Sequence, residues 1–133
     1  MSLKAVEIVR AHIEAFQAMD TERSASFMDD HVVADWARVW MLNPTGYGIE
    51  QVVRDVVHYR GTFDDFHYEA RDLTDLGSGQ VLVEIYEAGR GKGSGVPVER
   101  SYAVLYTVIA GKIVRVTTFS SAQEARQAIG APE

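Results

Sequence analysis

Apolar residues recur at helical spacing near the start of the chain, at Val6, Val9, Ile13 and Phe16. Because residues three or four apart share one face of a helix, this pattern predicts a helix over 3–19. Asp20 and Thr21 carry side-chain oxygens that can cap a second, short helix over 22–28. The chain therefore opens with a helical layer.

A strand is expected next, near 32–41, and the sequence "NPTG" at 43–46 ends it. Apolar residues then return to helical spacing, at Ile49, Val52, Val53 and Val56. They predict a third helix over 48–60 that ends before Gly61.

After Gly61 the period of the apolar residues changes from that of a helix to two, which is typical of strands. Strands are predicted over 66–73, 81–88, 98–108 and 112–119, and a short helix over 122–129. Short turns between neighbouring strands indicate an antiparallel meander. The fold class is therefore α+β, a curved antiparallel sheet with the N-terminal helices packed on one face and a cone-shaped pocket between them.

Composition narrows the class of protein. The length of 133 residues favours one domain, spanning 1–133. The net charge of −6 argues against binding to nucleic acids or to anionic membranes, which need a basic face. The chain has no cysteine, which excludes disulfides, thiolate metal sites and a cysteine nucleophile. The N-terminus has no long apolar stretch, so we expect neither a signal peptide nor a membrane span, and a cytoplasmic location.

Several segments together resemble one known superfamily. They are the Asp20 turn between two helices, "DDHVVADW", "GYGIEQVVRDV", the hairpin "GRGKGSG" and the closing "IAGKIVRVTTFSSAQEA". In their order and spacing they resemble the nuclear transport factor 2-like superfamily, also called cystatin-like, in its SnoaL-like and ketosteroid isomerase-like branch. The resemblance implies a cone-shaped cavity, but this fold hosts isomerases, cyclases, hydrolases, dehydratases and non-catalytic binding domains.

Site residues can be transferred from that resemblance by position. The catalytic tyrosine of ketosteroid isomerases matches His12, and their general-base aspartate matches Asp35. Their second acid matches Ala103, so this chain lacks it. The acid that SnoaL-type polyketide cyclases often carry on the last strand is also missing from 115–118. The resemblance thus implies Asp35 as general base, His12 as a proton shuttle or polarising group, and no cofactor.

The strand pattern leaves the orientation of Asp35 open. Asp35 shares one strand face with Val33 and Val39, whereas Trp36 and Trp40 share the other. If the Val33 face looks into the cone, Asp35 lies among apolar side chains and becomes a stronger base. If the tryptophan face is the buried one, Asp35 is solvated.

His12 lies beside the apolar stripe of its helix, so it could point into the pocket and stabilise an enolate-like oxygen. The alternative is a histidine that is merely buried at the edge of the core. The histidines show no paired spacing with acids, and we expect no metal site.

The strand over 98–108 also has two possible inner faces. Ser101 and Ala103 on the inside would leave room for a ligand, and Tyr102 and Tyr106 would then form an outer face suited to a homodimer. In the alternative, both tyrosines contact the ligand. With the first orientation, the expected pocket residues besides Asp35 and His12 are Phe16, Val33, Val53, Val83, Ile85, Ser101, Ala103, Val116 and Thr118.

Three hypotheses for function remain from the sequence. The first is a cofactor-independent isomerase, cyclase or lyase that uses a pocket carboxylate as general base on a small apolar carbonyl compound. The second is a non-catalytic domain that binds a small molecule or a partner segment in the same cone. The third is a dimeric structural domain with a vestigial cavity.

The glycine-rich run at 89–97 is interpreted as a hairpin and not as a phosphate-binding loop, because a strand follows it.

Overall fold

The computed structural model describes residues 2–37 and 44–130. The helices are α1 (Ser2–Gln17), α2 (Thr21–Ser26), α3 (Ile49–Arg60) and α4 (Ala122–Ile129). The strands are β1 (Met28–Asp35), β2 (Thr45–Tyr47), β3 (Phe63–Gly77), β4 (Gln80–Gly91), β5 (Pro97–Ile109) and β6 (Lys112–Phe119).

The helices form where their apolar periodicity and caps predict them. On α1, the buried residues Ala5, Val9 and Ile13 are four positions apart and form one stripe. The Asp20 carboxylate caps α2 by accepting a hydrogen bond from the backbone N–H of Arg23 at 3.1 Å. These helices close over one face of the sheet, as the sequence predicts.

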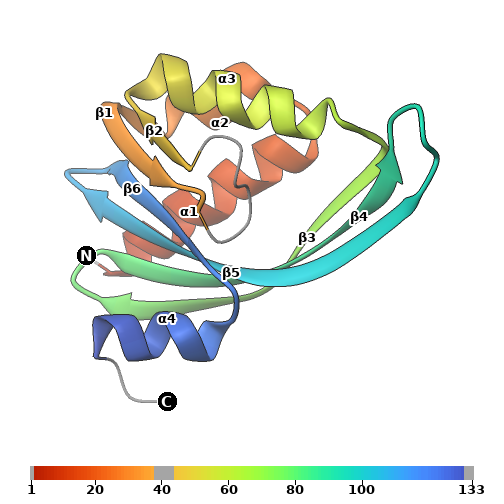
Figure 1. Ribbon diagram of the computed structural model, residues 1–133. Coiled ribbons are helices and arrows are strands. Elements are labelled where there is room, and N and C mark those ends of the chain that lie inside the picture. The colour runs from red at the N-terminus through yellow and green to blue at the C-terminus, as the bar shows by residue number, and fades with distance from the viewer. Residues whose placement is uncertain (1, 38–43, 131–133) are drawn as a thin grey trace.

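The six strands form one curved sheet in the order β2-β1-β6-β5-β4-β3. The long strands β3, β4 and β5 bend around α1, with α3 beyond it (Figure 1). All neighbouring pairs are antiparallel except β1 and β6, which run parallel. That parallel pair corrects the expected all-antiparallel sheet, and it is possible because most of the chain lies between the two strands and serves as their crossover.

The first strand differs most from expectation. β1 begins at Met28, four residues before the predicted start, because the exposed residues Asp30 and His31 hide its alternation. Val39 and Trp40 fall in 38–43, outside the described residues. The three-residue strand β2 was not predicted, since Gly46 at its centre carries no side chain to give a pattern.

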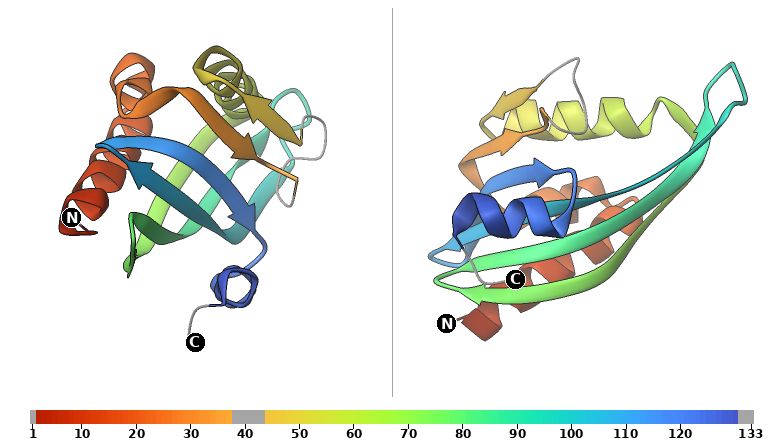
Figure 2. Two further views of the ribbon diagram at one scale, coloured as in Figure 1. Left: turned by 90° about the vertical axis from the view of Figure 1, so that its left-hand side faces the viewer. Right: turned by 60° about the horizontal axis from the view of Figure 1, so that its bottom comes forward.

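Two clusters of apolar residues lie on opposite faces of the sheet. The larger one fills the space between the concave face and helices α1 to α3. The smaller one packs α4 against the outer face, as the turned views in Figure 2 show, through Leu82, Ala103, Leu105, Phe119 and Ala125. None of the described helices combines the length and the apolar character that crossing a bilayer requires.

Candidate functional site

A cavity of about 120 Å³ lies between the concave face of the sheet and helices α1, α2 and α3. This volume is of the order of an engineered cavity of about 150 Å³ that holds benzene, so the cavity accommodates about one ring before any adjustment. Met19 and Val57 line it although their exposed fractions are 70% and 50%, so they mark its mouth. Most of the remaining lining is apolar or aromatic, which is usual for small-molecule sites.

One acid, Glu87, lies in the wall of this cavity. It is on β4, opposite Tyr68 of β3 and Arg100 of β5 in the sheet register, and its exposed fraction is only 3%. Arg100 Nε donates to Glu87 Oε1 at 2.6 Å, and the Tyr59 hydroxyl donates to the same oxygen. Glu87 Oε2 accepts from the Tyr102 hydroxyl at 3.0 Å. The carboxylate is thus buried but well supplied with donors.

Burial raises the pKa of Glu87 to about 7, since taking a carboxylate out of water penalises its charged form. The hydrogen bond from Tyr102 opposes this rise, because it favours the ionised carboxylate. Near neutral pH, Glu87 therefore exists in both the protonated and the ionised form.

Three tyrosine hydroxyls lie in the same wall, those of Tyr68, Tyr102 and Tyr106. Side-chain hydrogen bonds join Tyr68 to Tyr102 and to Tyr106. Burial raises the pKa of all three, and the charge of Glu87 adds to the rise at Tyr68 and Tyr102. All three hydroxyls therefore stay protonated and can donate hydrogen bonds at any physiological pH.

His12 of α1 also lines the cavity, with its ring 5.6 Å from that of Tyr106 in an edge-on arrangement. Its Nδ1 lies 2.9 Å from the Ser24 carbonyl oxygen, which can only accept, so Nδ1 carries a proton. Burial lowers the pKa of His12, and the hydrogen bond to Ser24 offsets part of that effect. The neutral ring therefore has its lone pair on Nε2.

An aromatic wall continues from the tyrosines toward the mouth. Phe16, Phe66 and Tyr68 contact one another edge-on or stacked, with ring centroids 4.7 to 6.4 Å apart. The guanidinium of Arg60 lies 4.5 Å from the centroid of Phe16 and 5.4 Å from that of Phe66. This end of the cavity thus combines aromatic faces with a cation.

Asp35 does not take the orientation that the base role needs. Val32 and Ala34 of β1 are fully buried and Trp36 lines the cavity, so the alternating face that carries Asp35 points away from it. The carboxylate is half-buried and accepts from the backbone N–H of Ala37 at 3.0 Å. The inward orientation predicted for Asp35 is wrong because the tryptophan face is the inner one.

Apart from Ser101 and Ala103, the expected pocket residues divide into three groups. Phe16, Val53, Val116 and Thr118 line the cavity together with His12. Val83 and Ile85 lie on the same concave face but are packed in the core and do not line the cavity. Val33 lies on the face of β1 that also carries Asp35, and it does not line the cavity either.

Ser101 and Ala103 lie on the outer face of the sheet, contrary to the preferred orientation of β5. Ala103 packs against α4, and Ser101 is exposed. Tyr102 and Tyr106 instead line the cavity, as the alternative orientation had it. The parity of β5 could not be read from its sequence because both faces are apolar, one under the helices and one under α4.

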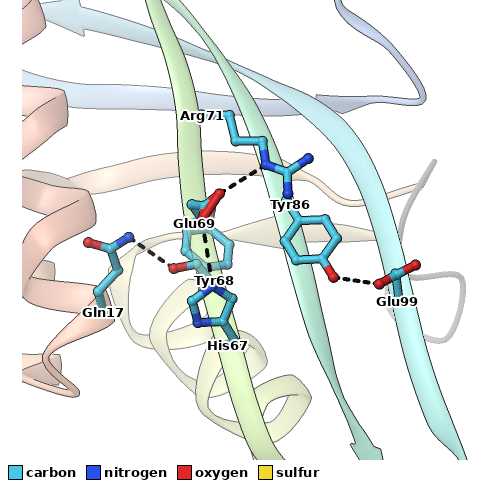
Figure 3. A network of polar contacts seen from close by, with 7 residues as sticks. All are labelled: Gln17, His67, Tyr68, Glu69, Arg71, Tyr86 and Glu99. Carbon is cyan, nitrogen blue, oxygen red and sulfur yellow. Dashed lines mark hydrogen bonds and ion pairs between the residues drawn. The ribbon is translucent and has the colours of Figure 1, made fainter.

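The outer face beyond α4 is polar. Glu69 pairs with Arg71 at 2.9 Å and with His67 at 3.7 Å, and the Tyr86 hydroxyl donates to Glu99 at 2.5 Å (Figure 3). The guanidinium of Arg71 also lies 4.1 Å from the centroid of the Tyr86 ring. Tyr102 and Tyr106 line the cavity on the opposite face of the sheet, so they do not form the outer dimer face expected for them.

Glu87 was missed from the sequence although a signal was present. It shares strand parity with Val81, Val83 and Ile85, two of which were expected to face inward. Extending that alternation by one step places an acid on the inner face.

Among the described residues, no group of three histidine, aspartate or glutamate side chains is arranged to hold a metal ion.

The comparisons agree on one architecture. A family model described as a SnoaL-like domain matches residues 9–116. No curated protein matches the chain in sequence. An NTF2-like protein from Burkholderia thailandensis E264 has a TM-score of 0.77 and 22% identity, covering 94% of this chain and 96% of that one.

Two further similar structures contain small molecules. A hypothetical protein of ketosteroid isomerase-like fold from Catenulispora acidiphila DSM 44928, in complex with trimethylamine, has a TM-score of 0.72 and 19% identity, covering 95% of this chain and 94% of that one. TerC co-crystallised with polyporic acid has a TM-score of 0.74 and 17% identity, covering 96% and 99%. At these identities the likeness shows the fold.

Proposed function

This chain belongs to the SnoaL-like domain family, and on that premise we propose that it is a cofactor-independent enzyme acting on a small apolar carbonyl compound. The reaction is an isomerisation, a cyclisation or an elimination, with a carboxylate of the cavity as general base. The observation that carries the proposal is Glu87, which is 3% exposed in the cavity wall and has a pKa raised to about 7. A base is most effective when its pKa lies near the working pH.

The proton transfer begins at Glu87 Oε2, which accepts one hydrogen bond, from Tyr102, and has a second lone pair for the substrate. Oε2 takes a proton from the carbon next to the substrate carbonyl. The electron pair of that C–H bond moves into the carbonyl group and forms an enolate. If the enolate is conjugated with a C=C bond, return of the proton from Glu87 to the far carbon completes an isomerisation. If it attacks a second carbonyl of the same molecule, a C–C bond closes a ring and the resulting alkoxide takes the proton. If it carries a leaving group on the β-carbon, expulsion of that group completes an elimination.

The developing enolate oxygen needs hydrogen-bond donors. The hydroxyls of Tyr68 and Tyr106 are suited to this role, because both are buried in the cavity wall and remain protonated. Each has a single proton, so a hydroxyl that binds the enolate oxygen gives up its hydrogen bond to a neighbouring tyrosine. His12 is suited to a different role in the proton transfer. With its proton on Nδ1 and held by Ser24, it presents Nε2 as an acceptor, so it can relay a proton but cannot donate to the enolate while neutral.

The relatives of known structure support a small-molecule site in this fold. One was crystallised with trimethylamine and another with polyporic acid. Both molecules are small organic compounds, in keeping with a ligand and not a macromolecule as the occupant of the cavity.

The proposal can be tested without knowing the natural substrate. A positioned base should accelerate exchange of the α-hydrogens of cyclohexanone, a one-ring ketone that suits the cavity volume, for deuterium in D₂O, followed by proton NMR. We expect the Glu87→Gln variant to lose about 10²–10⁴-fold of the enzyme-catalysed rate. Glu84→Gln is the matched control, since Glu84 is exposed on the same strand, and it should exchange at the wild-type rate. Equal rates for Glu87→Gln and wild type would contradict the proposal.

A non-catalytic binding domain is the second candidate, and the contacts of Glu87 favour it in one respect. Arg100, Tyr59 and Tyr102 together supply three donors to the carboxylate, which is also how a structural ion pair is built. In that case cyclohexanone would bind and its α-hydrogens would exchange only at the rate seen in buffer.

A homodimer through the outer face of the sheet is also part of the proposal. The face formed by His67, Glu69, Arg71, Tyr86 and Glu99 lies outside the smaller apolar cluster that packs α4 against the sheet. Sedimentation equilibrium should give twice the monomer mass, and charge reversal at Arg71 should shift it toward the monomer. A monomer at all concentrations would contradict this part.

A further inference from the structure

Arg60 brings a positive charge to the mouth of the cavity. It is the last residue of α3, lines the cavity, and lies one helical turn from Val56 and Val57, which line it too. One guanidinium N–H group donates to the backbone carbonyl of Phe16, and the central carbon of the group lies over the Phe16 and Phe66 rings, 4.5 and 5.4 Å from their centroids. These contacts hold the guanidinium in a fixed position.

Within the part of the chain that the structure describes, no carboxylate forms an ion pair with Arg60. The acid of the cavity, Glu87, is paired with Arg100. The chain has a net charge of −6, so acids are plentiful elsewhere. A half-buried cation that faces a cavity without a counter-ion is costly unless something binds it.

We propose that Arg60 recognises a carboxylate on the ligand, so that the cavity takes a small organic acid with an apolar body. A guanidinium binds carboxylates through two parallel hydrogen bonds. The Phe16 carbonyl engages one N–H group of Arg60, which leaves others for such a fork. Binding of this acid does not require catalysis, whereas its conversion as a substrate rests on the function proposed above. The expected apolar carbonyl compound then becomes a keto acid, whose carboxylate lies at the mouth and whose carbonyl reaches toward Glu87.

This arrangement has a consequence for protons. A ligand carboxylate in the cavity disfavours the ionised form of Glu87, because two like charges would share a site of low polarity. Binding of an acid near pH 7 should therefore be accompanied by uptake of a fraction of a proton at Glu87, because part of the protein is already protonated there. The complexes in which Glu87 stays ionised are the ones in which it acts as a base, so turnover of an acid should rise with pH above 7. A neutral ligand of the same shape should bind without proton uptake.

Benzoate and benzamide form a matched pair of probes, one ring each, which suits the cavity volume. We expect wild-type protein to bind benzoate at least about 10-fold more tightly than benzamide in isothermal titration calorimetry at pH 7. Arg60→Met should abolish that preference, and Arg60→Lys should keep part of it. Arg54→Met is the matched control on the same helix, since Arg54 is exposed, and it should leave the preference unchanged.

The proton uptake is measured by repeating the benzoate titration in phosphate and in Tris, whose ionisation enthalpies differ. Wild type should take up at most about half a proton per benzoate at pH 7, since Glu87 is already about half protonated there. Glu87→Gln should bind benzoate without uptake. Equal affinities for the two probes in wild type, or a preference that survives in both Arg60→Met and Arg60→Gln, would overturn the inference. If the preference depends on Arg60 but no deuterium exchange is catalysed, the Arg60 site stands and the enzymatic function fails.

Discussion

Glu87 and Arg100 face each other across β4 and β5, and Arg100 Nε donates to Glu87 Oε1 at 2.6 Å on the inner side of the sheet. The positive charge of Arg100 favours the ionised carboxylate, against the effect of burial. Removing it in Arg100→Met should move the titration of Glu87 to higher pH by about one unit, measured by carbon-13 NMR.

The control for that variant is Arg71→Met, which removes an arginine paired with Glu69 on the outer face (Figure 3). The sheet separates this pair from the cavity, so the pKa of Glu87 should stay at about 7. A similar change in both variants would mean that the net charge of the protein, and not the contact with Arg100, sets the pKa of Glu87.

Replacing Glu87 by Gln should change how stability depends on pH. The pKa of Glu87 is about 7 in the folded protein and near 4.5 when exposed. Between these values the folded state binds more protons than the unfolded state, so the free energy of unfolding falls as pH rises. From pH 4.5 to pH 8, wild type should lose up to about 3 kcal/mol relative to Glu87→Gln. Urea unfolding at both pH values measures this, and parallel curves would exclude a raised pKa.

His12 should have the opposite pH dependence. Burial lowers its pKa in the folded protein, so below the reference value of 6.5 the unfolded state binds more protons. The free energy of unfolding should then fall as pH is lowered, by up to about 1.4 kcal/mol per pH unit until the folded pKa is reached. His12→Gln should lack this part of the slope. Nitrogen-15 NMR should also find the proton on Nδ1, and a proton on Nε2 would contradict the tautomer assigned from Ser24.

Two glycines at the β3–β4 turn offer a matched pair of substitutions. Gly77 and Gly79 have similar positive φ angles of 84° and 81°, so alanine is strained at both. A Cβ at Gly79 would lie 2.3 Å from the carbonyl oxygen of Val108, whereas a Cβ at Gly77 would meet nothing within 4 Å. Gly79→Ala should therefore be less stable than Gly77→Ala, by about 2 kcal/mol or more in thermal unfolding. Equal losses would mean that the β3–β4 turn does not approach β5 as described.

Much of the fold could be predicted because its determinants are local. The helices follow from apolar spacing and from the Asp20 cap, and the long strands follow from their alternation. The superfamily suggested by the order of those segments is confirmed by the family model and the similar structures. The parallel pairing of β1 with β6 depends on residues far apart in the chain, so no local pattern indicates it.

The candidate site was harder to predict, because which face of a strand is buried is set by what packs on it. On β1 and β5 both faces carry apolar residues, so parity alone could not choose between them, and the choice was wrong for Asp35 and for Ser101. On β4, Val81, Val83 and Ile85 form one apolar face, and Glu87 is the next residue on it. The alternation of this strand alone therefore predicts an inward-facing acid at Glu87.

The most direct test of this account is the titration of Glu87 itself. Carbon-13 NMR of the side-chain carboxyl, assigned by comparison with Glu87→Gln, follows its ionisation between pH 4 and pH 9. The account predicts a midpoint at about 7. A midpoint near 4.5, the value of an exposed glutamate, would contradict a buried carboxylate poised for proton transfer in the cavity.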